Sequence, residues 1–157
     1  MNGRLIQFTG LAAALLALAW DAAVVTLTPP LVHGIIAARL PGAAGAAQWM
    51  AQRYLAVGAA GAVLYLLWAW SLRYYDYRRP PQPQRIPLSN LGAPAVLLLL
   101  GFFACSQYEQ MFEGAPLISR RVMFQAVLIV YVATTVAHYA LSSLLLRLRR
   151  DAGEDAI

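Results

Sequence analysis

The sequence contains no lysine, only one cysteine and few charged residues of any kind. Charged side chains make up 12% of the 157 residues, whereas a soluble globular domain has about 25%. With 61% hydrophobic residues as well, the chain is neither a disordered protein nor an ordinary soluble enzyme. A single cysteine, Cys105, cannot form a disulfide within the chain, which excludes a disulfide-stabilised secreted module.

Several catalytic and cofactor motifs are also missing from the sequence. It has no Walker-type glycine loop, no G-x-S-x-G, no H-E-x-x-H and no paired-cysteine metal motif. Each of these motifs supplies a specific chemical function, such as a phosphate cradle, an activated serine or a pair of zinc ligands. We therefore expect no cofactor and no metal of these kinds.

The sequence has instead four long stretches without Lys, Arg or Glu, at 5–28, 54–70, 91–108 and 122–146. Each has the length, about 17–25 residues, of a helix that crosses a bilayer. Residues 95–100 read AVLLLL and do not alternate as the strands of a membrane barrel would. The sequence predicts an all-α, polytopic membrane protein, a single domain with a four-transmembrane-helix bundle. A loop at 74–90 and a polar tail at 147–157 complete it.

The arginines predict the orientation of these spans. With four spans, eight of the arginines share one side with both termini: Arg4, Arg73, Arg78, Arg79, Arg85, Arg147, Arg149 and Arg150. Only Arg39, Arg53, Arg120 and Arg121 lie on the other side. The positive-inside rule then places both termini in the cytoplasm. The use of arginine alone, with abundant Ala and Leu, is typical of a GC-rich bacterial genome, which favours a bacterial inner membrane.

These arginines flank the spans and do not form a separate basic domain. We therefore expect contacts with the lipid bilayer and no nucleic acid. Aromatic residues at the ends of the second span have the placement of interfacial anchors: Trp49, Tyr54, Trp68, Trp70, Tyr74, Tyr75 and Tyr77.

Prolines and small residues predict local features of the bundle. Pro29 and Pro30 predict a kink or break at the end of the first span, followed by a continued helix, an interfacial helix or a re-entrant turn. The proline-rich segment 78–85 predicts an extended connector rather than a polyproline partner site. Gly58 and Ala62 form a small-x-x-x-small pair, which favours close packing within the chain over a dimer contact.

Asp21 is the strongest candidate for a functional residue. It lies roughly 24 Å into the first span by helical rise, where a carboxylate costs several kcal/mol unless it is paired, hydrogen-bonded or protonated. We therefore expect a shielded position, either as a structural hydrogen bond to another helix or as a binding or proton-relay group. Counting along the spans predicts that Tyr108 and Gln125 share its depth near the outer face.

Other polar residues are expected above this outward-facing pocket. Glu109 and Glu113, spaced i, i+4, and His33 could together bind a divalent metal. Because Arg120 and Arg121 are close by in sequence, salt bridges are the favoured interpretation, and we predict no metal. The ligand-binding candidates are therefore Asp21, His33, Tyr108, Glu109, Glu113 and Gln125.

His138 lies in the fourth span, about 24 Å from its outer end by helical rise. This depth predicts that Asp21 is not its partner. The favoured role is a structural hydrogen bond to a carbonyl or to Ser142, with proton transfer as the alternative. The depths of His33 and His138 argue against haem ligation by both.

These features predict a small inner-membrane protein that acts as an accessory or assembly subunit or as a small-molecule transport component. A membrane-protein partner or a homo-oligomer would fit this class. The alternative is a small intramembrane enzyme acting on a lipid, isoprenoid or quinone-like substrate, with Asp21 as the catalytic acid or base.

Overall fold

The computed structural model describes residues 3–39, 44–71, 75–77, 81–111 and 119–151, and it contains no strand among them. Four helices are long and apolar enough to cross a membrane. They are α1 (Gly3–Ala37), α2 (Ala44–Ser71), α4 (Gly92–Met111) and α5 (Arg120–Asp151). A 3-10 turn, η1 (Pro83–Arg85), and the short α3 (Ile86–Ser89) precede α4. The prediction of an all-α, four-helix membrane bundle is confirmed.

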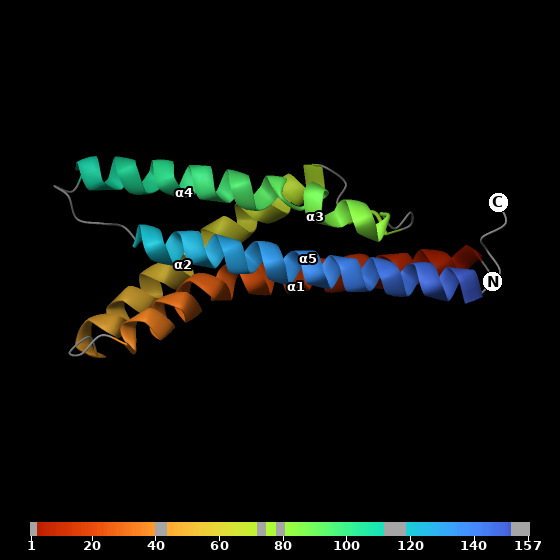
Figure 1. The fold of residues 1–157 in the computed structure, drawn as a ribbon, viewed down its shortest axis with the longest axis horizontal. Coiled ribbons are helices and arrows are strands. Elements are labelled where there is room, and N and C mark those ends of the chain that lie inside the picture. Colours follow the sequence, from red (N-terminus) through yellow and green to blue (C-terminus); the bar gives the residue numbers. More distant parts are fainter. Residues whose placement is uncertain (1–2, 40–43, 72–74, 78–80, 112–118, 152–157) are drawn as a thin grey trace.

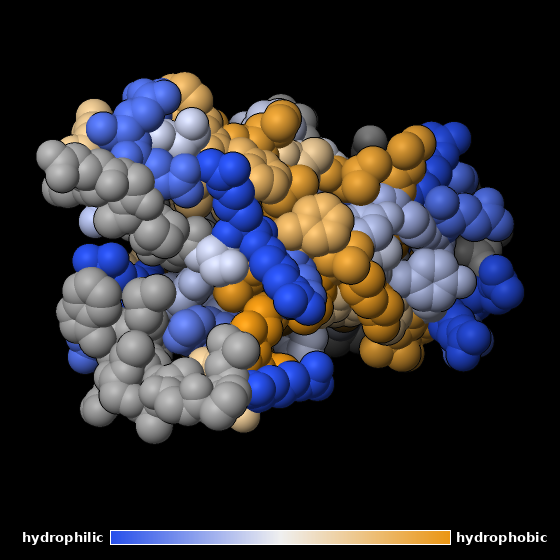
Figure 2. All heavy atoms as spheres, turned by 60° about the vertical axis from the view of Figure 1, so that its left-hand side comes forward, coloured by the Kyte–Doolittle hydropathy of each residue, from blue (hydrophilic) through white to orange (hydrophobic). Residues whose placement is uncertain are grey.

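The long helices α1 and α5 pack side by side along the length of the molecule (Figure 1). α1 packs against both α2 and α5, α4 packs against α5, and α2 meets α4 over a shorter stretch. α1 begins and α5 ends at the same end of the bundle, which we call the terminal end; the opposite end is the far end. Apolar residues form a band between hydrophilic regions on the face shown in Figure 2. That distribution matches a protein surrounded by lipid at its middle.

The first helix does not end at its prolines. Pro29 and Pro30 lie inside α1, which continues to Ala37, so the structure selects the continued helix from the three predicted alternatives. In Figure 1 α1 changes direction in its second half, where it leaves α5 and runs beside α2. Two missing N–H groups and the proline rings account for a kink at this place. Neighbouring helices make such prolines tolerable within a membrane span.

Gly58 in α2 lies directly against the α1 backbone at the kink. A β-carbon on Gly58 would stand 2.3 Å from the carbonyl oxygen of Thr26. Pro30 has no N–H and cannot donate the helical hydrogen bond to this carbonyl. α2 therefore places a residue without a side chain on a carbonyl that the proline has released. The predicted internal packing of the pair Gly58 and Ala62 is confirmed, since Ala62 is also buried.

The segment between α2 and α4 folds onto the bundle. Tyr77, Ile86 and Asn90 are each at most 2% exposed, and the Tyr77 carbonyl accepts a hydrogen bond from Nη2 of Arg149 at 3.1 Å. The predicted extended connector at 78–85 is found only in part: Gln82 has an extended backbone, whereas Pro83–Arg85 form the 3-10 turn η1; residues 78–80 lie outside the described residues. Burial of Tyr77 also makes its prediction as an interfacial anchor wrong.

Candidate functional site

Buried and half-buried polar side chains gather where α1, α2, α5 and the connector meet. We call them the polar layer, and they are Asp21, Tyr65, Tyr75, Tyr77, Asn90, Thr134 and His138. Asp21 and Thr134 are fully buried, and His138 is 2% exposed. Polar groups at such a depth are tolerated only when they satisfy one another.

Asp21 and His138 form the centre of the polar layer. Oδ2 of Asp21 lies 2.9 Å from Nε2 of His138 and accepts a hydrogen bond from the Tyr75 hydroxyl at 2.8 Å. On its other side, Nδ1 of His138 is hydrogen-bonded to the Tyr77 hydroxyl. One continuous chain of hydrogen bonds thus runs from Tyr75 through Asp21 and His138 to Tyr77.

The hydrogen bonds of His138 assign the proton positions in this chain. Burial raises the pKa of the Tyr77 hydroxyl above its usual range, and the charges of Asp21 and Tyr65 raise it further. Tyr77 is therefore a neutral phenol, which can donate or accept a hydrogen bond. The carboxylate of Asp21 can only accept, so a neutral His138 carries its proton on Nε2, and its Nδ1 accepts from the Tyr77 hydroxyl.

A second set of hydrogen bonds ties α2, Asn90 and α5 together. The Tyr65 hydroxyl donates to Oδ1 of Asn90 at 3.1 Å. Nδ2 of Asn90 donates to the hydroxyls of Thr134 and Thr135 at 2.8 and 2.7 Å. Thr134 lies one helical turn from His138, so the two sets are adjacent on α5.

Two polar atoms next to this network have no hydrogen-bond partner. Oδ1 of Asp21 and Oγ of Ser142 are both buried and unsatisfied. The predicted hydrogen bond between His138 and Ser142 is therefore wrong. A buried carboxylate oxygen without a partner is costly and marks the place where a proton or water would be stabilised.

The prediction that His138 is too deep to meet Asp21 is wrong. That estimate placed the outer end of the first span at Thr28, so Asp21 seemed to lie close to the outer face. α1 instead continues through the prolines to Ala37. Asp21 precedes this end by 16 residues, and His138 follows the first residue of α5, Arg120, by 18. The two side chains consequently lie at the same level.

The predicted grouping of Asp21 with Tyr108 and Gln125 is not found. The residue next to α4 that reaches the polar layer is Asn90, just before the first turn of α4. Tyr108 lies near the opposite end of α4, about 24 Å further along by helical rise. Gln125 is in the second turn of α5, well before His138.

Of the other predicted site residues, Glu109 and His33 lie at the far end. Glu109 forms a salt bridge with Nη2 of Arg120 at 2.7 Å, which confirms the salt bridge favoured for this region. Glu113 lies outside the described residues. His33 stacks on Tyr54, with ring centroids 4.4 Å apart, and its Nε2 is buried without a hydrogen bond. Among the described residues no group of three His, Cys, Asp or Glu could hold a metal.

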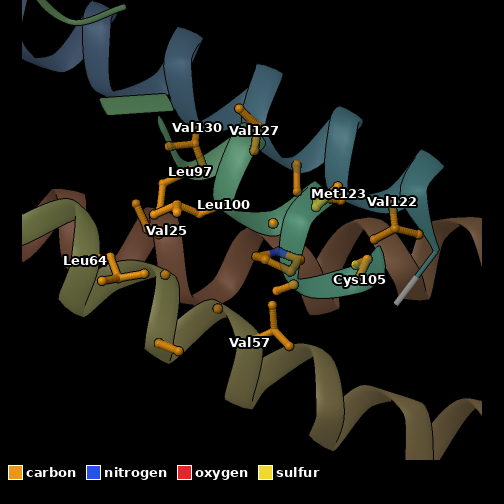
Figure 3. Close-up of a pocket in the computed structure, with 17 residues that line it drawn as sticks. Val25, Val57, Leu64, Leu97, Leu100, Cys105, Val122, Met123, Val127 and Val130 are labelled. Atoms are coloured by element: carbon orange, nitrogen blue, oxygen red, sulfur yellow. The ribbon is translucent and has the colours of Figure 1, made fainter. Parts of the chain in front are cut away.

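An apolar cavity lies between the polar layer and the far end (Figure 3). Its volume is about 280 Å³. All four long helices line it, with side chains that include Val25, Leu64, Leu97, Met123 and Val130. Val25 follows Asp21 by one helical turn and Val130 precedes Thr134 by one turn, so the cavity adjoins the polar layer.

A second, more polar cavity of about 380 Å³ lies in the terminal half of the molecule. The first turns of α1 form one side of it, and Tyr75, Asp76 and Tyr77 form the other. The hydroxyls of Tyr75 and Tyr77 also bond to Asp21 and His138. These two tyrosines therefore separate the second cavity from the Asp21–His138 pair.

Sequence reasoning missed the roles of Tyr75, Tyr77 and Asn90. The two tyrosines lie in an arginine-rich loop, where they resemble residues of an aromatic belt. The spacing of residues in this loop does not show that it folds inward and brings Asn90 with it. One signal was available: two buried ionisable residues, Asp21 and His138, need partners of opposite or complementary character.

Comparison of the chain with models of protein families, with curated proteins and with solved structures gave no match.

Proposed function

We propose that this protein binds an apolar molecule of the membrane, a lipid or isoprenoid chain, as a small-molecule transport component of a bacterial inner membrane. Both termini would then face the cytoplasm, as the distribution of arginines favours. The observation that carries the proposal is the apolar cavity enclosed by α1, α2, α4 and α5.

The chemistry of the lining supports an apolar ligand. The lining consists of aliphatic and small residues, one proline, one cysteine and one methionine. None of the described residues that line the cavity is charged, and the polar layer next to it is largely satisfied by its own hydrogen bonds. Transfer of a hydrocarbon chain into such a cavity needs no polar partner.

The position of the cavity supports entry from the bilayer. Leu64 on α2 is 47% exposed and Leu100 on α4 is 44% exposed, yet both line the cavity. They belong to the two helices that meet over only a short stretch. A chain moving within the membrane would therefore enter sideways, between α2 and α4.

Ala60 offers a direct test, because it lines the cavity and its neighbour Ala59 does not, although both are exposed on α2. We expect Ala60→Phe to fill the entrance and to lower binding of a photoreactive isoprenoid or fatty acid by about tenfold, or ~1.4 kcal/mol. Cross-linking in nanodiscs, with mass spectrometry of the labelled residues, measures this effect.

Ala59→Phe adds the same ring one residue away and should leave labelling of the cavity unchanged. If both variants label like the wild type, or if label appears equally on every lipid-facing helix, the cavity is not a binding site. Circular dichroism and size exclusion establish that the variants are folded.

An intramembrane enzyme is the second candidate, favoured by the acid–base pair Asp21 and His138 one helical turn from the cavity. Asp21 itself is fully buried, which ranks binding above catalysis. If the purified protein converts a bound lipid or isoprenoid, Asp21→Asn should abolish turnover while ligand binding remains. Activity that survives in a folded Asp21→Asn protein would remove Asp21 as the catalytic acid or base.

A further inference from the structure

Both ends of the hydrogen-bond chain Tyr75–Asp21–His138–Tyr77 reach the same cavity. Tyr75 and Tyr77 line the second cavity, and their hydroxyls bond to Oδ2 of Asp21 and Nδ1 of His138. The side chain of Tyr75 therefore separates the second cavity from Asp21, and that of Tyr77 separates it from His138. Hydrogen-bonded hydroxyls of this kind can pass a proton by exchanging donor and acceptor roles.

Toward the far end, the described residues next to the pair are mainly apolar. The next turn of α1 after Asp21 brings Val25, which lines the apolar cavity. On α5 the Thr134 hydroxyl, one turn from His138, donates to the Val130 carbonyl at 2.8 Å, and Val130 also lines the apolar cavity. An apolar cavity of this size carries no chain of polar groups that could hold bridging water.

The electrostatics of the pair favour the uptake of a proton. With a neutral histidine, the fully buried Asp21 carboxylate leaves a net negative charge at membrane depth, and its Oδ1 has no hydrogen bond. One added proton makes the pair neutral overall and removes most of the cost of burying a charge. In so close a pair the proton belongs to both residues rather than to either one.

The titratable and charged groups around the pair come from several elements. α1 contributes Asp21 and α2 contributes Tyr65, while Asn90 adds only an uncharged amide. The remaining groups belong to the connector and α5: Tyr75, Asp76, Tyr77, His138 and Arg149. Arg149 is held by the Tyr77 carbonyl, so the basic partner in contact with Asp21 is His138.

We propose that the Asp21–His138 pair is a proton-binding site that exchanges protons only with the terminal end of the molecule. It is a binding site with one entrance and not a channel. The proposal does not depend on the ligand of the apolar cavity, so either can fail without the other.

Histidine-selective ¹⁵N NMR tests the binding of the proton, because the chain has only two histidines. His33→Gln leaves His138 as the only labelled ring. We expect its ring-nitrogen signals to change as the pair takes up a proton, and this change to differ between the wild type and Asp21→Asn, because the amide can neither hold the proton nor balance the charge of the ring. A change that is absent, or that is the same in a folded Asp21→Asn protein, overturns the proposal.

Two measurements test the single entrance. The His138 ring N–H should lose measurable exchange with water in the double variant Tyr75→Phe/Tyr77→Phe. Tyr139→Phe is the matched control, since Tyr139 is exposed on the same helix next to His138, and it should exchange as the wild type does. Exchange that persists in the folded double variant contradicts entry through the tyrosines.

Vesicles that contain the protein should also hold an imposed pH gradient as long as empty vesicles do. Faster loss of the gradient would show a path to the far end and would overturn the proposal of a single entrance.

Discussion

Gly58→Ala is expected to destabilise the bundle by about 3 kcal/mol, at the upper end of the cost of overpacking. The new β-carbon would lie 2.3 Å from the Thr26 carbonyl oxygen. The neighbouring atoms belong to backbone, which cannot rotate away as a side chain can. α1 and α2 must therefore separate at the kink, where both helices also line the apolar cavity. Unfolding in mixed micelles, followed by circular dichroism, measures the change.

Two other glycines serve as controls for this prediction. A β-carbon at Gly61, one turn along the same helix, would be 3.6 Å from Cγ1 of Val25, which is ordinary contact. At Gly34 it would meet nothing within 4 Å. Alanine at either position should be neutral or stabilising by about 0.5–1 kcal/mol, because it reduces the freedom of the unfolded chain. Equal losses in all three variants would contradict the close approach of Gly58.

His138→Leu is expected to cost about 3–5 kcal/mol, because it leaves the buried Asp21 carboxylate without its partner. The double variant Asp21→Leu/His138→Leu removes both ionisable groups and should recover a large part of this loss. Thermal unfolding in detergent of the wild type, Asp21→Leu, His138→Leu and the double variant gives the coupling between the two residues.

Ser142→Ala is the matched control for this pair, one helical turn from His138 on the same face of α5. Its hydroxyl is buried without a partner, so its removal should leave stability unchanged or raise it. A His138→Leu protein as stable as Ser142→Ala would show that the pair contributes nothing to the fold.

The four-helix architecture follows from the sequence because four stretches of the right length contain no Lys, Arg or Glu, and Asp21 is the one acid within them. Hydrocarbon excludes unpaired backbone groups and charged side chains so strongly that the windows at 5–28, 54–70, 91–108 and 122–146 each coincide with part of a long helix. The cost of placing a charged group in hydrocarbon also predicts that Asp21 is shielded, and its side chain is completely buried.

The residues that contact Asp21 could not be predicted from the absence of charge in the spans. Depth along a helix depends on where the helix ends, and Pro29 and Pro30 predict an end at the prolines. In a membrane a proline pair bends a helix that its neighbours continue to hold, so α1 reaches Ala37. The positions of Tyr75 and Tyr77 are not predictable from any local pattern. Their loop folds inward because it packs against residues that are distant in the sequence.

The length of α1 has a consequence for the surrounding lipid. A straight helix of 35 residues is about 52 Å long, whereas the hydrocarbon layer is only about 30 Å thick. Exposed apolar side chains run along it from Phe8 to Ile35, so an upright α1 would place some of them in headgroups. The bend at Pro29 and Pro30 lets the two halves tilt separately. A bent α1 can keep more of its apolar length within the hydrocarbon layer than a straight upright helix, a form of hydrophobic matching that leaves the Asp21–His138 contact in place.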